Sequence, residues 1–231
     1  MRIIARIQND FSSKFGVPRQ SGLVQEVESR VVFEPEFRVA EALRGIEDFS
    51  HLWILWAFHE AKRGGGKDDS WQPTVRPPRL GGNTRLGVFA TRSPFRPNPI
   101  GLSCVRLLRV EEDPHLGHVL VIGGADMMNG TPVYDVKPYI PYADCHPEAT
   151  GGFVDQTQKR TVDVVIPEKW LAVIPADKLE ALRGVLHQDP RPAYHDDLGR
   201  VYGFDFANME VRFSVAEGVL TVCEVTLHDP A

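Results

Sequence analysis

The sequence predicts a mainly β protein whose first part is a closed barrel and whose last part is a small α+β unit. Most apolar runs are short, and they either alternate with period two or stay apolar for only a few residues, as strands do. Only two segments show helical spacing. Long polar stretches separate the expected strands. A barrel gathers such connections at one end, which favours it here, although the pattern also allows a sandwich.

Strands dominate the first part of the chain. Val24–Phe33 alternates apolar and polar residues, while Leu52–Phe58 is continuously apolar, which is typical of a strand buried on both faces. A short helix is expected at Glu36–Arg44, because its apolar residues have helical spacing and Gly45 follows as a capping glycine. The expected strands are Ile3–Ile7, Val24–Phe33, Leu52–Phe58, Leu86–Thr91, Leu102–Val110, Val119–Ile122 and Val133–Ile140.

The chain divides into three expected parts: a barrel domain at 1–148, a linker at 149–160 and a small α+β domain at 161–231. The linker region combines Gly, Thr and Gln without apolar periodicity. The last part has a helix at about Ala176–His187, where four apolar residues share one face and Pro190 and Pro192 follow. Its expected strands are Val162–Ile166, Val201–Phe206, Met209–Val215 and Leu220–Leu227.

Charge is distributed unevenly. The net charge is −5, yet the 41 residues from Ser70 to Val110 contain seven Arg and no Asp, Glu or Lys. Arg presents a planar fork that suits phosphates, carboxylates and stacked bases. This window therefore predicts an anion-binding surface, with an ordinary solvated basic face as the alternative.

Several common site types are not expected. The three cysteines are far apart, which argues against a disulfide framework or a cysteine zinc site and favours a reducing cytoplasm. The sequence has no GxGxxG fingerprint, and Gly66-Lys67 continues with Asp68, so it is not a phosphate-binding loop. No metal site, signal peptide or membrane-spanning helix is expected.

Three polar segments carry the candidate chemistry. The first is the loop 15–22. The second is the segment 87–101, in which three prolines hold Arg, Ser and Asn side chains in a stiff loop. The third is 126–139, where Asp135, Lys137 and Tyr139 share one strand face by period two. That face is either an interior polar site or an ion pair on the solvent side.

These segments resemble the TsaA-like family of TrmO tRNA methyltransferases, and the match runs over nearly the entire chain. The resemblance implies a single-sheet β-barrel, usually a homodimer, that uses S-adenosylmethionine as methyl donor. It also implies methyl transfer to N6 of threonylcarbamoyl-adenosine in the tRNA anticodon arm, t6A37 to m6t6A37. The matching runs are Phe49–Leu55, His59-Glu60, Pro73–Gly82, Gly87–Gly101, Asn129–Pro132, Asp135–Tyr139 and Asp189–Tyr194.

The same resemblance carries over a set of cofactor contacts. This chain has Asn129 where many relatives have Asp, and Glu60 where many have Gln. The first change removes a carboxylate and the second adds one. The implied contacts are Pro18, Arg19, Gln20, His59, Glu60, Arg92, Leu102, Asn129, Gly130, Thr131 and Pro132.

The acceptor nitrogen of a urea-like group is a weak nucleophile, so a proton acceptor is expected. Asp135 is the first candidate, and Tyr139 and His59 are the others. Arg76, Arg79, Arg85 and Arg96 are the candidate RNA contacts, with Trp71 or Phe95 stacking on a loop base. Two alternative functions stay open: a regulatory module that only binds S-adenosylmethionine, and a small-molecule methyltransferase without tRNA activity.

Overall fold

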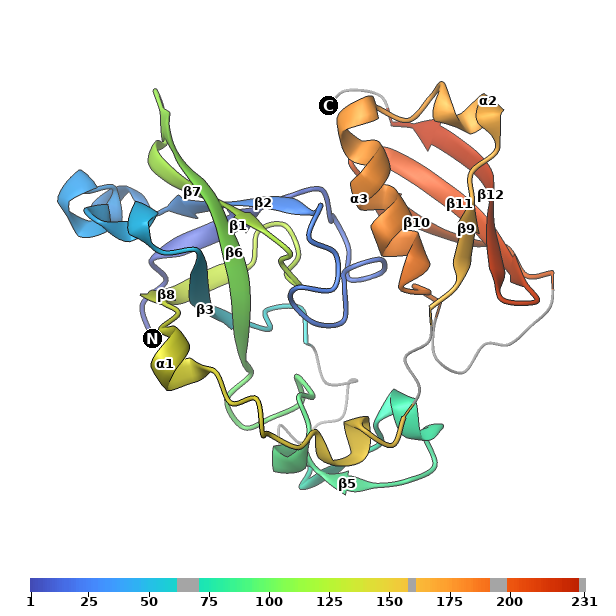
Figure 1. Ribbon diagram of the computed structural model, residues 1–231, viewed down its shortest axis with the longest axis horizontal. Coiled ribbons are helices and arrows are strands. Elements are labelled where there is room, and N and C mark those ends of the chain that lie inside the picture. Colours follow the sequence, from blue (N-terminus) through green and yellow to red (C-terminus); the bar gives the residue numbers. More distant parts are fainter. Residues whose placement is uncertain (62–70, 158–160, 192–198, 229–231) are drawn as a thin grey trace.

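The structure is a computed structural model, and it describes residues 1–61, 71–157, 161–191 and 199–228. Figure 1 shows two sheet-containing parts side by side, one built from strands between Ala5 and Pro138 and one from the C-terminal third of the chain. Each part has its own cluster of buried hydrophobic residues.

Six antiparallel strands form a closed barrel in the order β1-β2-β7-β6-β3-β8, so that each strand pairs with two neighbours. Alternate side chains such as Ile7, Ile54 and Val105 fill the interior. The predicted mainly β architecture is confirmed. The strand bounds are β1 Ala5–Gln8, β2 Glu28–Phe33, β3 His51–Ala57, β6 Ile100–Asp113, β7 Gly117–Gly123 and β8 Pro132–Pro138.

Three long connections gather at one end of this barrel. They are 9–27 between β1 and β2, 58–99 between β3 and β6, and 124–131 between β7 and β8. Because ring neighbours are antiparallel, the ends of β1, β3 and β7 lie at the same rim as the starts of β2, β6 and β8. This rim, called the loop end below, is where the first two polar segments meet the start of the third.

Two sequence predictions about local structure are wrong. The expected helix at Glu36–Arg44 is instead a series of 3₁₀ turns, η1 Pro35–Phe37, η2 Ala40–Leu43 and η3 Ile46–Asp48. A single amphipathic segment this short does not hold an α-helix by itself, and among the residues of these turns only Leu43 is buried. The expected strand Leu86–Thr91 pairs only at β5, Leu86–Gly87, with β4, Thr74–Val75. Val88–Ala90 then forms the 3₁₀ turn η5.

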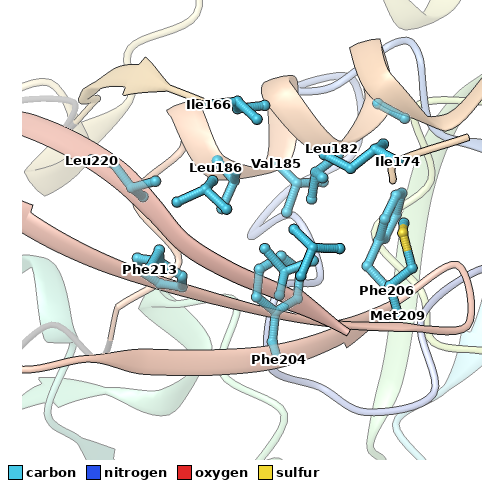
Figure 2. Packing of buried hydrophobic residues seen from close by; sticks show 14 of the residues in the cluster. Ile166, Ile174, Leu182, Val185, Leu186, Phe204, Phe206, Met209, Phe213 and Leu220 are labelled. Atoms are coloured by element: carbon cyan, nitrogen blue, oxygen red, sulfur yellow. The ribbon is translucent and has the colours of Figure 1, made fainter. Parts of the chain in front are cut away.

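The C-terminal part is a four-stranded sheet covered by one helix. The helix α3, Ala176–His187, has the predicted bounds. Figure 2 shows Leu182, Val185 and Leu186 of this helix pointing onto Phe206 and Phe213 of the sheet. The strands β10 Tyr202–Phe206, β11 Met209–Ala216 and β12 Val219–Leu227 are antiparallel, and β9 Asp163–Val165 adds in parallel.

Four short helical turns complete the described elements. The turn α1, Pro141–Asp144, follows β8, and α2, Glu168–Leu171, precedes α3. The other two are η4 Pro78–Leu80 and η6 Gly152–Val154. The end of the predicted linker, 158–160, and the helix-ending Pro192 lie outside the described residues.

The two parts share the 9–27 connection. Phe11, Val24 and Val27 belong to the C-terminal core although they precede β2 in the chain. Asp10 adds polar contacts, since its carboxylate lies 2.7 Å from Lys178 Nζ and its carbonyl accepts from Ala207 N at 3.1 Å. The C-terminal sheet therefore packs beside the loop end of the barrel.

The hairpin at the other end of the barrel makes stability depend on pH. The Asp113 carboxylate accepts hydrogen bonds from the backbone N–H groups of His115 and Leu116 and from Arg30, which lowers its pKa from 3.8 to about 2. Because the folded-state pKa is depressed, this stabilisation is present above the ordinary value and is lost as the pH falls through about 2.

We expect Asp113→Asn to lower the unfolding temperature at pH 7 and to make little difference near pH 2. Thermal melts across this range, with the exposed Glu112→Gln as control, test it. A pH-independent difference contradicts the assignment.

Candidate functional site

The three polar segments are joined by hydrogen bonds at the loop end. Arg92 Nη1, from the second segment, donates to Gln20 Oε1 of the first. The backbone of Ser21 donates to the carboxylate of Asp126, which opens the third. Gly22 N donates to Gly124 O at 2.8 Å. Residues far apart in the chain therefore form one polar cluster around Gln20, Arg92 and Asp126.

A buried chain of hydrogen bonds reaches this cluster from the barrel interior. Trp56 Nε1 donates to Ser103 Oγ at 2.9 Å, and Ser103 Oγ donates to Asp126 Oδ1. Trp56 and Ser103 are buried, whereas Asp126 is half-buried. Burial raises the pKa of the Asp126 carboxyl, while the hydrogen bonds from Ser103 and Ser21 and the charge of Arg92 oppose that shift. This carboxyl was in a candidate segment but was not singled out from the sequence.

Gly101 leaves space for the indole ring of Trp56, the first member of this series of hydrogen bonds. It lies directly opposite Trp56 in the β3–β6 register, and a Cβ at Gly101 would lie 2.1 Å from Trp56 Cε2. Two carbon atoms that are not bonded to each other cannot lie that close, so a side chain at this position must displace the indole ring. The glycine that closes the 87–101 segment therefore serves the packing of the site.

We expect Gly101→Ala to destabilise the protein by about 1–3 kcal/mol, the usual cost of overpacking a filled core. Urea unfolding of the purified variant measures it. Gly87→Ala is the matched control, because Gly87 has a φ of −57° and no atom lies within 4 Å of its Cβ position. Equal losses from the two variants would contradict the packing role.

The proline-rich segment is held by its own side chains. Arg96 Nη1 donates to Thr91 O at 2.8 Å, and Ser93 Oγ accepts from Phe95 N at 3.2 Å. Arg96 is half-buried and its carbon Cζ lies 5.8 Å from the centre of the Phe89 ring. The guanidinium proposed from the sequence as an RNA contact thus already fixes the shape of the loop.

The other predicted cofactor residues are less closely grouped. Arg19 donates to the carbonyls of Asp189 and Arg191, so it holds the segment after α3. His59 and the exposed Glu60 follow β3 and lead into 62–70, which lies outside the described residues. Pro18 is buried beside Arg19 in the first loop.

The turn before β8 is tied to the start of the barrel. Asn129 Oδ1 accepts from Asn9 N at 3.2 Å, and Gly130 N donates to Ile7 O at 2.7 Å. Thr131 is buried, and Pro132 begins β8. Asn129 thus shapes the turn through its amide oxygen, an acceptor role that an Asp carboxylate would also fill.

Asp135 and Tyr139 do not form an interior site. Asp135 Oδ2 lies 3.2 Å from Lys137 Nζ, with side chains 43% and 65% exposed, so the pair faces solvent. The prediction of an interior polar site is therefore wrong, and the alternative of an ion pair on the solvent side agrees with the structure. The ion pair joins two residues of one strand rather than two strands. Tyr139 follows β8, at the rim opposite the loop end, with its ring 5.9 Å from that of Trp53. Loss of hydration and the neighbouring Cys145 thiol raise the pKa of its phenol.

Leu102 also faces outward. It pairs with Leu55 on β3, which in turn pairs with Asp135, and it is 57% exposed while the next residue, Ser103, is buried. A strand alternates its side chains between faces, so Leu102 and Ser103 point to opposite sides of the barrel wall. The structure thus brings Gln20 and Arg92 together and leaves Leu102 on the outer surface.

The 71–96 region presents arginines and aromatic rings to solvent. Arg76 and Arg85 are exposed, and Arg85 donates to Thr74 Oγ1 at 3.0 Å. Arg79 lies in η4, and its side chain is outside the described part. Trp71 is 41% and Phe89 70% exposed, with ring centres 5.7 Å apart. Phe89 was missed because the sequence placed it inside a strand, where alternation alone does not reveal a turn that exposes a ring.

Two negative observations concern the described residues only. No group of three or more His, Cys, Asp or Glu side chains there is arranged to hold a metal ion. Within the same ranges, no helix combines the length and apolarity needed to cross a membrane.

The structure is therefore a mainly β barrel with a polar loop end and an adjacent arginine-rich, aromatic surface. Comparison with known proteins identifies its family. The N-terminal domain model of tRNA-methyltransferase O matches residues 6–145, and the TrmO C-terminal domain model matches 169–228. The chain belongs to the TrmO family, as its motifs indicated.

Individual relatives agree. The chain is 42% identical to the tRNA (adenine(37)-N6)-methyltransferase of Escherichia coli (strain K12), over 93% of this chain and 92% of the relative. It is 42% identical to the enzyme of that name from Eikenella corrodens, over 75% and 95% respectively. The crystal structure of TrmO from Pseudomonas aeruginosa superposes with a TM-score of 0.75 at 31% identity, covering 97% of each chain.

Proposed function

We propose that this chain transfers a methyl group from S-adenosylmethionine to N6 of threonylcarbamoyl-adenosine 37 in tRNA. Relatives that match nearly its whole length are named tRNA (adenine(37)-N6)-methyltransferases. The observation that carries the proposal is the Gln20–Arg92–Asp126 cluster. Its Arg92 lies on the same 58–99 connection as the exposed arginine–aromatic surface. In this proposal the cluster binds the methyl donor, and the arginine–aromatic surface binds the RNA. A tRNA substrate places the activity in the cytoplasm.

The cofactor has a carboxylate, an ammonium, a cationic sulfur and a purine. Arg92 supplies a planar donor fork for the carboxylate, and its bond to Gln20 limits the orientations of the guanidinium. Glu60 supplies an acceptor for the ammonium, and Leu102 supplies an apolar wall for the purine. In this proposal residues 1–148 are the cofactor-binding catalytic domain, residues 149–160 a linker, and residues 161–231 a small α+β domain whose core also takes in the 9–27 connection.

The active form in this proposal is a homodimer. Leu102 lies on the outer barrel surface next to Leu55, so a second copy covering this face would enclose a cofactor that also contacts Leu102. Light scattering at assay concentrations is expected to give twice the mass of one chain. A monomer that binds S-adenosylmethionine with full affinity would contradict the arrangement.

Methyl transfer into two tRNA pools tests the function. One pool comes from cells lacking this gene, and the other also lacks the threonylcarbamoyl group. Label from S-adenosylmethionine in the first pool alone, recovered as m6t6A after nucleoside digestion, is the expected result. Label in neither pool with intact cofactor binding would favour a regulatory module. Label only in a small molecule would favour a small-molecule methyltransferase without tRNA activity.

A further inference from the structure

The Trp56–Ser103–Asp126 chain has a fixed direction. An indole N–H only donates, so Ser103 Oγ accepts from Trp56 and has a single proton left to give. That proton goes to Asp126 Oδ1. These two bonds hold Asp126 as an acceptor. The same carboxylate also accepts from the Ser21 backbone, and it lies close enough to Arg92, the partner of Gln20, for the guanidinium charge to act on it.

Fold stability does not account for this arrangement. Burying a serine and a carboxyl group at the barrel rim costs free energy of desolvation. Apolar side chains of similar size would not carry this cost. The outer surface of the barrel offers a comparison, because Trp53 Nε1 donates to Asp144 Oδ2 at 3.0 Å there without a buried intermediary. At the loop end, by contrast, two buried side chains orient one half-buried carboxyl toward the predicted cofactor contacts.

We infer that Asp126 is the proton acceptor of the methyl transfer and that Ser103 and Trp56 are its positioning residues. The inference rests on the proposed function. The N6 lone pair forms the new bond to the methyl carbon as the carbon–sulfur bond breaks, and the sulfur keeps that electron pair and becomes neutral. The N6 proton passes to the Asp126 carboxylate. The carboxyl later returns it to solvent.

The surroundings suit this role. Burial raises the pKa of the Asp126 carboxyl, which brings a carboxylate closer to the basicity useful at neutral pH. Arg92 is the charged group acting on it among the described residues, and it favours the ionised form needed before the reaction. Asp135, the proton acceptor expected from the sequence, instead faces solvent beside Lys137.

The test compares carboxyl-to-amide variants at saturating substrates. Asp126→Asn keeps the size and an acceptor for Ser103, so it is expected to lower kcat by about 10²–10⁴-fold and to leave S-adenosylmethionine affinity within about threefold, less than ~0.7 kcal/mol. Asp144→Asn, which alters the half-buried carboxyl that accepts from Trp53 on the outer surface, is the matched control and should leave kcat unchanged. Wild-type activity on modified tRNA establishes the proposed function independently of either variant.

Unchanged kcat in Asp126→Asn would overturn the inference, as would a loss confined to cofactor affinity or a fall in kcat seen with Asp135→Asn alone. Ser103→Ala serves where Asp126→Asn does not fold. Removing the Ser103 hydrogen bond takes away a contribution that lowers the Asp126 pKa, so the acid limb of the kcat–pH profile is expected to move to higher pH. An unmoved acid limb in a folded Ser103→Ala protein would also overturn the inference.

Discussion

Replacing Arg92 by alanine is expected to weaken S-adenosylmethionine binding by roughly 30-fold or more. Truncating one partner of a charged hydrogen-bonded pair costs at least ~2 kcal/mol, and each 1.4 kcal/mol is about tenfold in affinity. We use this lower limit because Arg92 is exposed in the free protein. Equilibrium dialysis with labelled S-adenosylmethionine measures the change directly. Arg92→Lys keeps the charge without the planar fork, so an intermediate loss is expected.

Arg109→Ala is the matched control for this experiment. Arg109 belongs to the same acid-free window, but its guanidinium pairs with Glu28 and Glu111 on the barrel surface. Its loss is expected to leave cofactor affinity unchanged. Equal effects of the two substitutions would mean that net charge matters and that the loop-end geometry does not.

Removing the Phe89 ring is expected to weaken tRNA binding by roughly 5- to 150-fold, because a base stacked on an aromatic side chain contributes about 1–3 kcal/mol. Phe89 is the most exposed ring of the loop region and lies against both Trp71 and Arg96. Filter binding of Phe89→Ala to the modified tRNA, at several salt concentrations, measures the loss. S-adenosylmethionine affinity should not change.

The salt dependence separates stacking from charge. Phe89→Ala is expected to shift affinity without altering the log–log salt slope, whereas Arg76→Ala should reduce that slope by about 0.7. Tyr142→Ala is the control for ring removal, since Tyr142 is 93% exposed on α1, far along the chain from this surface. A Phe89→Ala protein that binds tRNA normally would contradict the stacking role.

The strands and the long helix were predictable because their signals are local. Period-two alternation or a short continuous apolar run identified the barrel strands, and the apolar face of α3 with the prolines after it indicated its bounds. The prediction for 36–44 was wrong because its apolar spacing suggested an α-helix, whereas a segment this short with one buried residue forms only 3₁₀ turns. The turn that exposes Phe89 was missed because the sequence placed this residue inside the expected strand Leu86–Thr91.

The site was only partly predictable. Its three polar segments were recognisable from residue type, but the bonds joining Gln20 to Arg92 and Ser103 to Asp126 depend on how distant strands pair. The importance of Ser103 follows only from the register that sets Gly101 opposite Trp56. Period two likewise grouped Asp135 with Tyr139 without saying which side of the barrel wall they occupy.

The central claim is that the loop end of the barrel holds the methyl donor. A crystal structure of the chain with S-adenosylhomocysteine, the product of the transfer, tests this most directly. We predict that its carboxylate contacts Arg92 and that its sulfur faces the Asp126 carboxyl. The product bound instead in the pocket lined by Asn9, Lys178 and His228, where the two parts of the chain meet, would contradict the account.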